Sequence, residues 1–248
     1  MKNCRDKIRK TYHIINRVSR RLLVNSGFSL VELMVSISIF MVITSITLVN
    51  YPKFSNKLSL DLLAEDMALS LRQAQIFGSS VLGAKGGSGS TKAFSEYGIH
   101  LDDPDNYTAE YNYILFADIN GSRSYNGPEA VATNFVCPLI GGPVANQECL
   151  QIFKVTGFNR VRSLCKDYAT DEAIDQRIAS CSKDEKQLGS MDVVFVRPNL
   201  DPKFFLKGKL GEVKDTTNIS NVGIILESAG GEYTKTIVIW RTGQISVE

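Results

Sequence analysis

Residues 28–49 read FSLVELMVSISIFMVITSITLV, an unbroken apolar run that decides how the rest of the chain is organised. The run has 22 residues, contains no glycine or proline, and carries a single charged residue, Glu32. As a helix it extends roughly 30 Å, about the thickness of the hydrocarbon core of a bilayer. The sequence therefore predicts one transmembrane helix over residues 28–49.

Lysine and arginine crowd the segment that precedes this run. Residues 1–27 contain eight basic residues and one acid, so the positive-inside rule keeps them in the cytoplasm and sends the following chain outward. From Phe28 onward 20 basic and 25 acidic residues remain, a net charge of −5. A mildly acidic domain argues against nucleic acid as a partner.

A secretory signal peptide is the first alternative for a basic segment followed by an apolar run. Such a signal has an apolar core of roughly 7–15 residues and a small-residue cleavage site after it. Here the small-residue junction, Ser26-Gly27, precedes the run. Cleavage after Gly27 removes the basic leader, residues 1–27, and leaves the hydrophobic helix as the mature N-terminus. A plain single-pass anchor is the second alternative.

Glu32 distinguishes a functional helix from a plain anchor. A lone carboxylate inside a bilayer costs several kcal/mol, so an acid at this depth indicates a function and a partner. The positive end of a neighbouring helix, with the free amine of a mature Phe28, attracts such an anion. We expect this pairing to set the register of one helix against the next.

The segment Gly27-Phe28-Ser29-Leu30-Val31-Glu32-Leu33 resembles the prepilin peptidase site of type IV pilins and type II secretion pseudopilins. The resemblance implies cleavage after Gly27, N-methylation of Phe28 and a role for Glu32 in assembly. It implies prepilin peptidase and other pilin or pseudopilin subunits as partners. The implied location is the bacterial inner membrane, crossed once with the C-terminal domain outside the cytoplasm, and then a pilus or pseudopilus.

A second helical pattern follows the membrane run, over residues 50–78. Pro52 marks the membrane exit and is expected to kink the helix rather than end it. Apolar residues then recur every three or four positions, which is typical of a helix that packs one face on a core: Leu60, Leu63, Met67, Leu71, Ala74 and Phe77. Gly78 is expected to stop this amphipathic half.

Residues 79–248 are predicted to form an antiparallel β domain, which makes the fold class α+β. The predicted strands are Tyr97–Leu101, Tyr111–Ala117, Val131–Val136, Leu150–Thr156, Met191–Val196, Phe204–Leu206, Val222–Glu227, Thr236–Trp240 and Gln244–Val247. Turn signals such as Gly230-Gly231 and Thr242-Gly243 separate them. Residues 165–190 are predicted to be an inserted loop, helical in part over Asp171–Ala179.

The β domain resembles the minor pseudopilins of the GspH/FimT group in the stretches LSLRQAQIFGSS, VVFVRPN and IVIWRTGQISV. This resemblance implies a low-abundance subunit near a filament tip. Members that bind DNA for uptake carry a C-terminal Gly-Arg-x-Arg pattern. Here Gly243 is followed by Gln244 and Ser246 where the arginines belong. DNA uptake is the alternative function. It is not favoured, because the C-terminal hairpin carries too few cations for several phosphate contacts.

Four of the five cysteines lie beyond the membrane run: Cys137, Cys149, Cys165 and Cys181. An even number in an exported domain fits two disulfides, with free buried thiols as the alternative. Four cysteines allow three pairings, and we favour the two short loops, Cys137–Cys149 and Cys165–Cys181. No CxxC pair occurs, which argues against a zinc site.

One loop has the ligand rhythm of a calcium site. Oxygen-bearing side chains occupy alternate positions and an acid stands at position 12; these candidate ligands include Asp118, Asn120, Ser122 and Glu129. Arg123 replaces the turn glycine, and no adjoining helix is expected. The favoured alternative is a β-hairpin turn at Asn120-Gly121.

An enzymatic function is not favoured. His13 lies in the leader, so His100 is the only histidine left for catalysis after cleavage. No nucleophile-elbow motif accompanies it. We expect no catalytic site, no metal and no cofactor, and interpret the chain as a structural subunit.

Overall fold

The computed structural model describes residues 27–80, 84–85, 91–92, 96–102, 112–126, 137, 148–155, 159–170, 174–181, 187–198 and 201–248. The chain forms two compact units, which meet in sequence between Pro52 and Lys53. The strands all belong to the second unit. The predicted strand Val131–Val136 lies outside the described residues.

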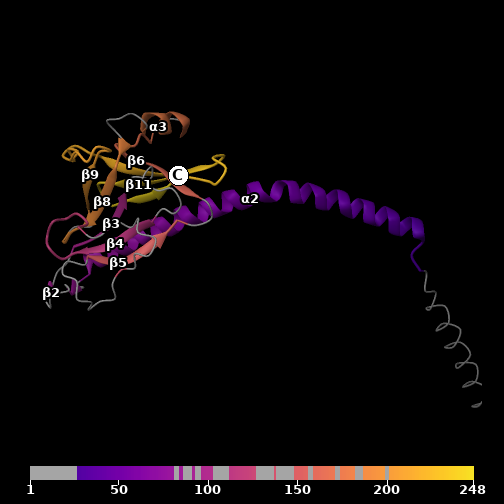
Figure 1. Ribbon diagram of the computed structural model, residues 1–248, viewed down its shortest axis with the longest axis horizontal. Helices are drawn as coiled ribbons and strands as arrows, with labels where there is room; N and C mark the ends of the chain where they lie inside the picture. The colour runs from indigo at the N-terminus through magenta and orange to yellow at the C-terminus, as the bar shows by residue number, and fades with distance from the viewer. Residues whose placement is uncertain are drawn as a thin grey trace, which may run out of the picture. The chain divides into compact units, whose positions relative to one another are not determined.

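Helix α2 runs from Leu30 to Ser79 (Figure 1). Pro52 lies inside it and does not end it, as expected, and the kink expected at this proline stays a prediction. The helix ends one residue after Gly78, as predicted. At this end the Cβ of any other residue at position 78 would stand 2.7 Å from the backbone oxygen of Phe195.

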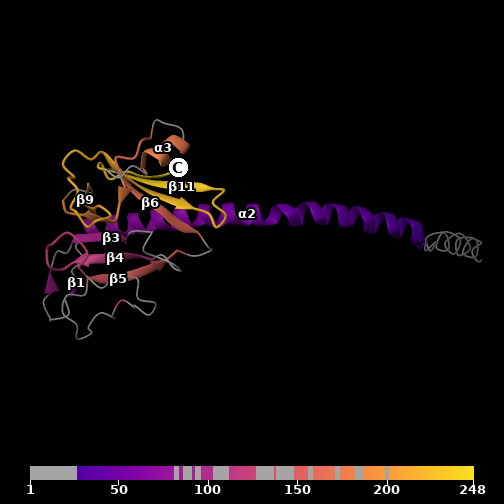
Figure 2. The same ribbon diagram turned by 45° about the horizontal axis from the view of Figure 1, so that its top comes forward.

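Two five-stranded antiparallel sheets make up most of the second unit. The first sheet has the strand order β5 (Cys149–Lys154), β4 (Asn112–Asp118), β3 (Glu96–Asp102), β8 (Ser190–Phe195) and β9 (Pro202–Lys207). Figure 2 shows β3, β4 and β5 lying side by side. Among the strands that the structure describes, β5 and β9 lie at the two edges of this sheet.

The second sheet has the strand order β12 (Ile245–Val247), β11 (Thr234–Trp240), β10 (Asn221–Glu227), β6 (Arg160–Lys166) and β7 (Gln187–Leu188). A short helix, α3 (Ile174–Cys181), lies in the chain between β6 and β7. The strands β1 (Ala84–Lys85) and β2 (Thr91–Lys92) pair with each other. The fold is thus α+β, as predicted.

The apolar face of α2 beyond Pro52 supplies the centre of the core. Leu60, Met67 and Leu71 belong to one buried cluster with residues of both sheets, among them Ile99, Leu115, Val193, Phe195, Ile224, Leu226, Ile237 and Ile239. The predicted stripe of residues three or four apart is therefore the buried face of the helix. Burying each such side chain contributes about 1.5–3 kcal/mol.

Of the described strands, β1, β2, β6 and β7 were missing from the sequence prediction, and β6 is internal to the second sheet. The prediction placed Cys165 at the start of an inserted loop, whereas β6 spans Arg160–Lys166 and pairs with β10 and β7. A register shift in the β6–β10 ladder falls between Ile225 and Leu226. Such a bulge breaks the alternation of apolar and polar residues by which a strand is recognised.

The remainder of the predicted insertion is also partly regular. Helix α3 begins and ends slightly later than the predicted segment Asp171–Ala179, and β7 occupies Gln187–Leu188.

The turn glycines behave as predicted at two hairpins of the second sheet. Gly231 has φ 71° and Gly243 has φ 85°, a backbone conformation that glycine adopts without strain.

Candidate functional site

The N-terminal residues of α2 separate the predicted scissile junction from the helix. Gly27 and Phe28 precede the first helical residue, Leu30, and Phe28 is exposed. The Ser29 hydroxyl accepts a hydrogen bond from the Glu32 N–H at 3.2 Å, and the Ser29 carbonyl accepts one from Leu33 N–H at 3.1 Å. Ser29 thus caps the helix, and the Gly27–Phe28 bond lies in non-helical backbone that an enzyme can bind.

Polar side chains within the apolar run are satisfied by their own helix. Ser36, Ser45 and Thr44 donate to carbonyls four residues earlier, at 2.8, 2.8 and 2.6 Å. Ser38 and Thr47 do the same to carbonyls three or four residues earlier. These bonds remove the cost of placing hydroxyl groups in hydrocarbon.

Glu32 differs from the serine and threonine residues of the apolar run, because its side chain does not bond to its own helix. Its carboxylate lies in the first turn of α2, where the helix dipole favours an anion. Within the described part of the chain, this carboxylate has no hydrogen-bond or ion-pair partner. A carboxylate at this depth needs a partner, and the helix itself does not supply one.

Helix α2 is long and apolar enough to cross a membrane, judged by length and composition. Its large apolar side chains before Pro52 are exposed, among them Leu30, Phe40, Ile43, Ile46 and Val49. An exposed apolar surface on every side of a helix is typical of a membrane span.

Comparison with known families agrees with this N-terminal geometry. The family model of the prokaryotic N-terminal methylation motif matches residues 24–48. The chain is therefore type IV pilin-like, with a motif that implies processing by prepilin peptidase and assembly with other pilins. The match covers the junction and most of the apolar run, and no part of the β domain. No curated protein and no solved structure matched the chain.

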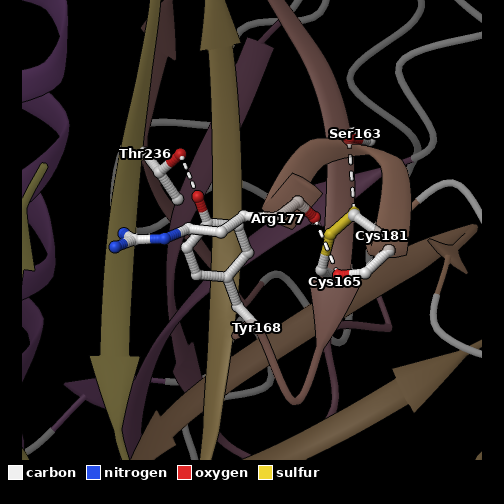
Figure 3. The surroundings of a disulfide bond; sticks show 7 residues. Ser163, Cys165, Tyr168, Arg177, Cys181 and Thr236 are labelled. Atoms are coloured by element: carbon white, nitrogen blue, oxygen red, sulfur yellow. Dashed lines mark hydrogen bonds between the residues drawn. A yellow bond between two sulfur atoms is a disulfide. The ribbon is translucent and has the colours of Figure 1, made fainter. Parts of the chain in front are cut away.

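Both disulfides follow the pairing that the sequence favoured. Cys137 is bonded to Cys149 and Cys165 to Cys181, with Cα–Cα distances of 5.4 and 5.6 Å, in the range that disulfides adopt. Cys165 lies on β6 and Cys181 is the last residue of α3, so the second bond joins the helix to the second sheet (Figure 3). Tyr168, whose hydroxyl lies 3.2 Å from the Thr236 hydroxyl, packs beside it.

In the loop with calcium-like spacing, which begins at Asp118, side-chain oxygens accept hydrogen bonds from backbone N–H groups. The buried Asp118 carboxylate accepts the N–H groups of Gly121, Ser122 and Arg123, at 2.6, 3.1 and 2.9 Å. The Asn120 side-chain oxygen accepts a second bond from Ser122 N–H. Such bonds are those of an Asx turn. Glu129 lies outside the described residues, so calcium binding, the less favoured hypothesis for this loop, stays untested.

The predicted hairpin turn at Asn120-Gly121 needs correction. Gly121 has φ 84° and the chain does turn here. The strand that pairs with β4, however, is β5, which begins only at Cys149. The connection between them is therefore far longer than a hairpin loop, and Asn120-Gly121 opens it.

Sequence reasoning missed a buried polar cluster around His100. Its Nδ1 lies 2.6 Å from an Asp192 oxygen and its Nε2 lies 3.0 Å from an Asp102 oxygen. Burial lowers the pKa of His100, but the hydrogen bonds and charges of Asp102 and Asp192 outweigh it and raise the pKa to about 9. The ring of Tyr125 packs on the imidazole ring, with 4.9 Å between the two ring centroids. The cluster is a buried charge network of the first sheet.

The C-terminal hairpin considered for DNA binding has its cations engaged. Lys235 lies 3.4 Å from Asp61, and Arg241 donates to the Thr217 carbonyl at 2.7 Å. Glu227, a buried acid of β10, binds Arg160 and Arg162 of β6. The acids thus offset the charge of Lys235, Arg160 and Arg162, which leaves fewer cations to neutralise phosphates.

Proposed function

We propose that this chain is a minor pilin or pseudopilin, a structural subunit of a type IV pilus or type II secretion pseudopilus. Prepilin peptidase cuts between Gly27 and Phe28, and Phe28 becomes the N-methylated end of the mature chain. The subunit resides in the bacterial inner membrane until α2 packs with the helices of other subunits. The β domain then faces the space outside the cytoplasm.

The carrying observation is the isolated carboxylate of Glu32. The hydroxyl groups at positions 36, 38, 44, 45 and 47 bond to carbonyls of their own helix, and the described contacts of the Glu32 carboxylate include no such bond. A partner from a neighbouring subunit resolves this, and the new amine at Phe28 has the right charge. The pairing explains why the acid lies within one helical turn of the cleavage site.

The GspH/FimT resemblance adds the finer assignment. It favours a minor subunit over the major one, and the α+β fold with two antiparallel sheets is compatible with it. The alternative of DNA uptake has little support, because Gln244 and Ser246 stand where the arginines belong and Lys235 pairs with Asp61.

Substitution of Glu32 tests the proposal. The Glu32→Ala chain should be cleaved normally but enter filaments poorly, because the acid is needed after processing. Glu32→Gln, which keeps the shape and removes the charge, should fail in the same way. The readout is the ratio of mature protein in sheared filaments to mature protein in membranes, measured by immunoblot.

Glu65 provides a matched control, since it is an exposed acid on the same helix. Glu65→Ala should assemble like the unmodified chain. Normal incorporation of both Glu32 variants would contradict the assembly role of Glu32.

A further inference from the structure

The tripeptide Asn120-Gly121-Ser122 has the Asn-x-Ser pattern of acceptors for N-linked glycans in exported proteins. The same pattern occurs at Asn218-Ile219-Ser220. A third example, Asn106-Tyr107-Thr108, lies outside the described residues. A pattern this short also arises by chance, so the sequence alone does not separate an acceptor from a bystander. The structure separates the two described examples, because the chain is held differently in each.

The first tripeptide, here named the Asn120 site, lies on the surface. All three of its residues are exposed, and they follow β4 at the start of the long connection to β5. A glycan is bulky and hydrophilic, so it needs an attachment point on an exposed loop. The middle residue is Gly121, which has no side chain that could anchor the site in the core.

One hydrogen bond orients the Asn120 side chain. Its Oδ1 accepts the Ser122 N–H at 2.7 Å. Among the described residues, its Nδ2 group has no hydrogen-bond partner. The oxygen and the nitrogen of an amide diverge from one carbon, so a bond from the oxygen to the loop leaves the nitrogen on the other side. The atom that carries an N-linked glycan is therefore accessible.

The Ser122 hydroxyl, the second group that the acceptor pattern requires, is also at the surface. It donates to the Ser124 carbonyl at 2.8 Å and accepts Asn126 Nδ2 at 2.5 Å, and both contacts are exposed. Hydrogen bonds between exposed groups contribute little net stability, because water replaces them. An enzyme can therefore bind this hydroxyl without opening the core.

The second tripeptide, the Asn218 site, is held by the core. Asn218 is exposed, but Ile219 beside it is only 3% exposed and belongs to the main hydrophobic cluster. Ser220 N–H donates to Asp167 Oδ1 at 3.0 Å, and the Ser220 carbonyl accepts Arg241 N–H at 2.9 Å. An enzyme that binds the whole tripeptide must first draw Ile219 out of the core, which requires local unfolding.

We propose that Asn120 accepts an N-linked glycan from a polyprenyl-pyrophosphate-linked oligosaccharide at the outer face of the membrane. This inference rests on the proposed function for its location, because export places the β domain on that side. Asn120 Nδ2 forms a bond to C1 of the first sugar, while the bond from C1 to the pyrophosphate oxygen breaks. Polyprenyl pyrophosphate leaves with that electron pair, and one Nδ2 proton passes to a base of the transferase. No oxidant or reductant takes part.

Glycan transfer to the purified full-length chain in detergent tests the proposal. The chain is incubated with a polyprenyl-pyrophosphate-linked oligosaccharide and a single-subunit oligosaccharyltransferase that accepts Asn-x-Ser/Thr, and glycopeptides are mapped by mass spectrometry. We expect occupancy at Asn120 at least about tenfold above that at Asn218, because unpacking one isoleucine side chain lowers the reactive population by at least that factor. Equal or higher occupancy at Asn218 would overturn the proposal. An unmodified Asn120, in a reaction that modifies a control acceptor peptide, would overturn it as well.

Two serine variants of the same loop separate the acceptor pattern from the shape of the loop. Ser122→Ala keeps Asn120 and removes the hydroxyl that the pattern requires, so the glycan at Asn120 should be lost. Ser124→Ala is the control, because Ser124 lies outside the tripeptide and bonds Ser122 through its backbone carbonyl. It should be modified like the unmodified chain. A glycan that persists on Ser122→Ala, or that is lost equally from both variants, would contradict the assigned site.

The glycan and the proposed function can fail separately. The transfer reaction uses purified protein and does not depend on filament assembly, so an unmodified Asn120 refutes the glycan and leaves the proposed function standing. If Glu32→Ala enters filaments normally, the proposed function fails, whatever the occupancy at Asn120.

Discussion

At the residue scale, His100 has the environment of a buried cation. It lies directly across from Asp192 in the β3–β8 ladder and two positions from Asp102 on its own strand. Residues two apart on a strand share a face, so the imidazole ring lies between two carboxylates. With a pKa of about 9 it is protonated at neutral pH, and the three side chains form one buried charge network.

This network predicts a pH dependence of stability. The folded pKa of about 9 lies above the ordinary value of 6.5, so the stabilisation is complete below about pH 6.5 and is lost as the pH rises through 9. His100→Asn should therefore lower the free energy of unfolding by ~3 kcal/mol at pH 6. The deficit should shrink as the pH approaches 9.5.

Thermal unfolding of the purified chain in detergent, compared between the two proteins at pH 6, 7.5 and 9.5, measures this deficit. Tyr125 packs on the ring and remains neutral over this range, because burial raises its pKa. A deficit that stays the same at all three values would show that His100 is not a buried cation.

The sequence predicted some of these residues and not others, for a physical reason. The roles of Gly27 and Glu32 can be predicted from the sequence, because they depend on residues only a few positions away along the chain. His100 and Asp192 are 92 positions apart and meet only through strand pairing, which the sequence alone does not specify. The same holds for Glu227 with Arg160 and Arg162, which β10 and β6 bring together.

At the scale of elements, the C-terminal end of α2 is fitted closely to β8. A Cβ at position 78 would lie 2.7 Å from both the Cβ and the carbonyl oxygen of Phe195. The Arg197 side chain also donates to the Gly78 carbonyl at 3.2 Å. The glycine thus ends the helix and permits a contact that no larger residue allows.

Gly78→Ala should destabilise the β domain by about 1–3 kcal/mol, the usual cost of overpacking. The backbone oxygen at Phe195 cannot move away as a flexible side chain would. Urea unfolding, followed by far-ultraviolet circular dichroism, measures the change in midpoint. Gly230→Ala is the control, because a Cβ there meets nothing closer than 3.9 Å. Equal midpoints for the two variants would mean that α2 and β8 are not in close contact.

Strand β6 shows where pattern recognition failed at this scale. Its sequence RVRSLCK alternates between exposed and buried positions only over residues 160–163, and Leu164 and Cys165 are then buried as well. The bulge against β10 and the burial of both faces near Cys165 produce this run. In helix α2 apolar residues recur every three or four positions without interruption, and its C-terminal end was predicted to within one residue.

At the scale of the whole molecule, the fold class was predictable and the division into two sheets was not. Apolar strands separated by turns indicate an antiparallel domain, but each strand could pair in either sheet. The order is set by long-range contacts such as β3 with β8 and β10 with β6. The cysteines are the exception, since short loops between them limited the plausible pairings in advance.

The disulfide Cys165–Cys181 supports a whole-molecule prediction. It closes a loop with a sequence separation of 16, and both cysteines are buried. The double variant C165A/C181A should lose ~3 kcal/mol of stability, measured as the urea midpoint of the oxidised chain. C137A/C149A, which opens a loop with a separation of 12, should lose a similar amount. An unchanged midpoint in both variants would contradict a stabilising role for the disulfides in the β domain.

Cleavage between Gly27 and Phe28 is the step on which the proposed prepilin identity depends most. The most direct measurement is intact mass spectrometry with N-terminal sequencing of the protein recovered from membranes of cells that contain a prepilin peptidase. We predict a mature chain that begins with N-methylated Phe28, and retention of residues 1–27 when Gly27 is replaced by a bulky residue. A mature N-terminus at any other position, or normal maturation of the Gly27 variant, would contradict the account.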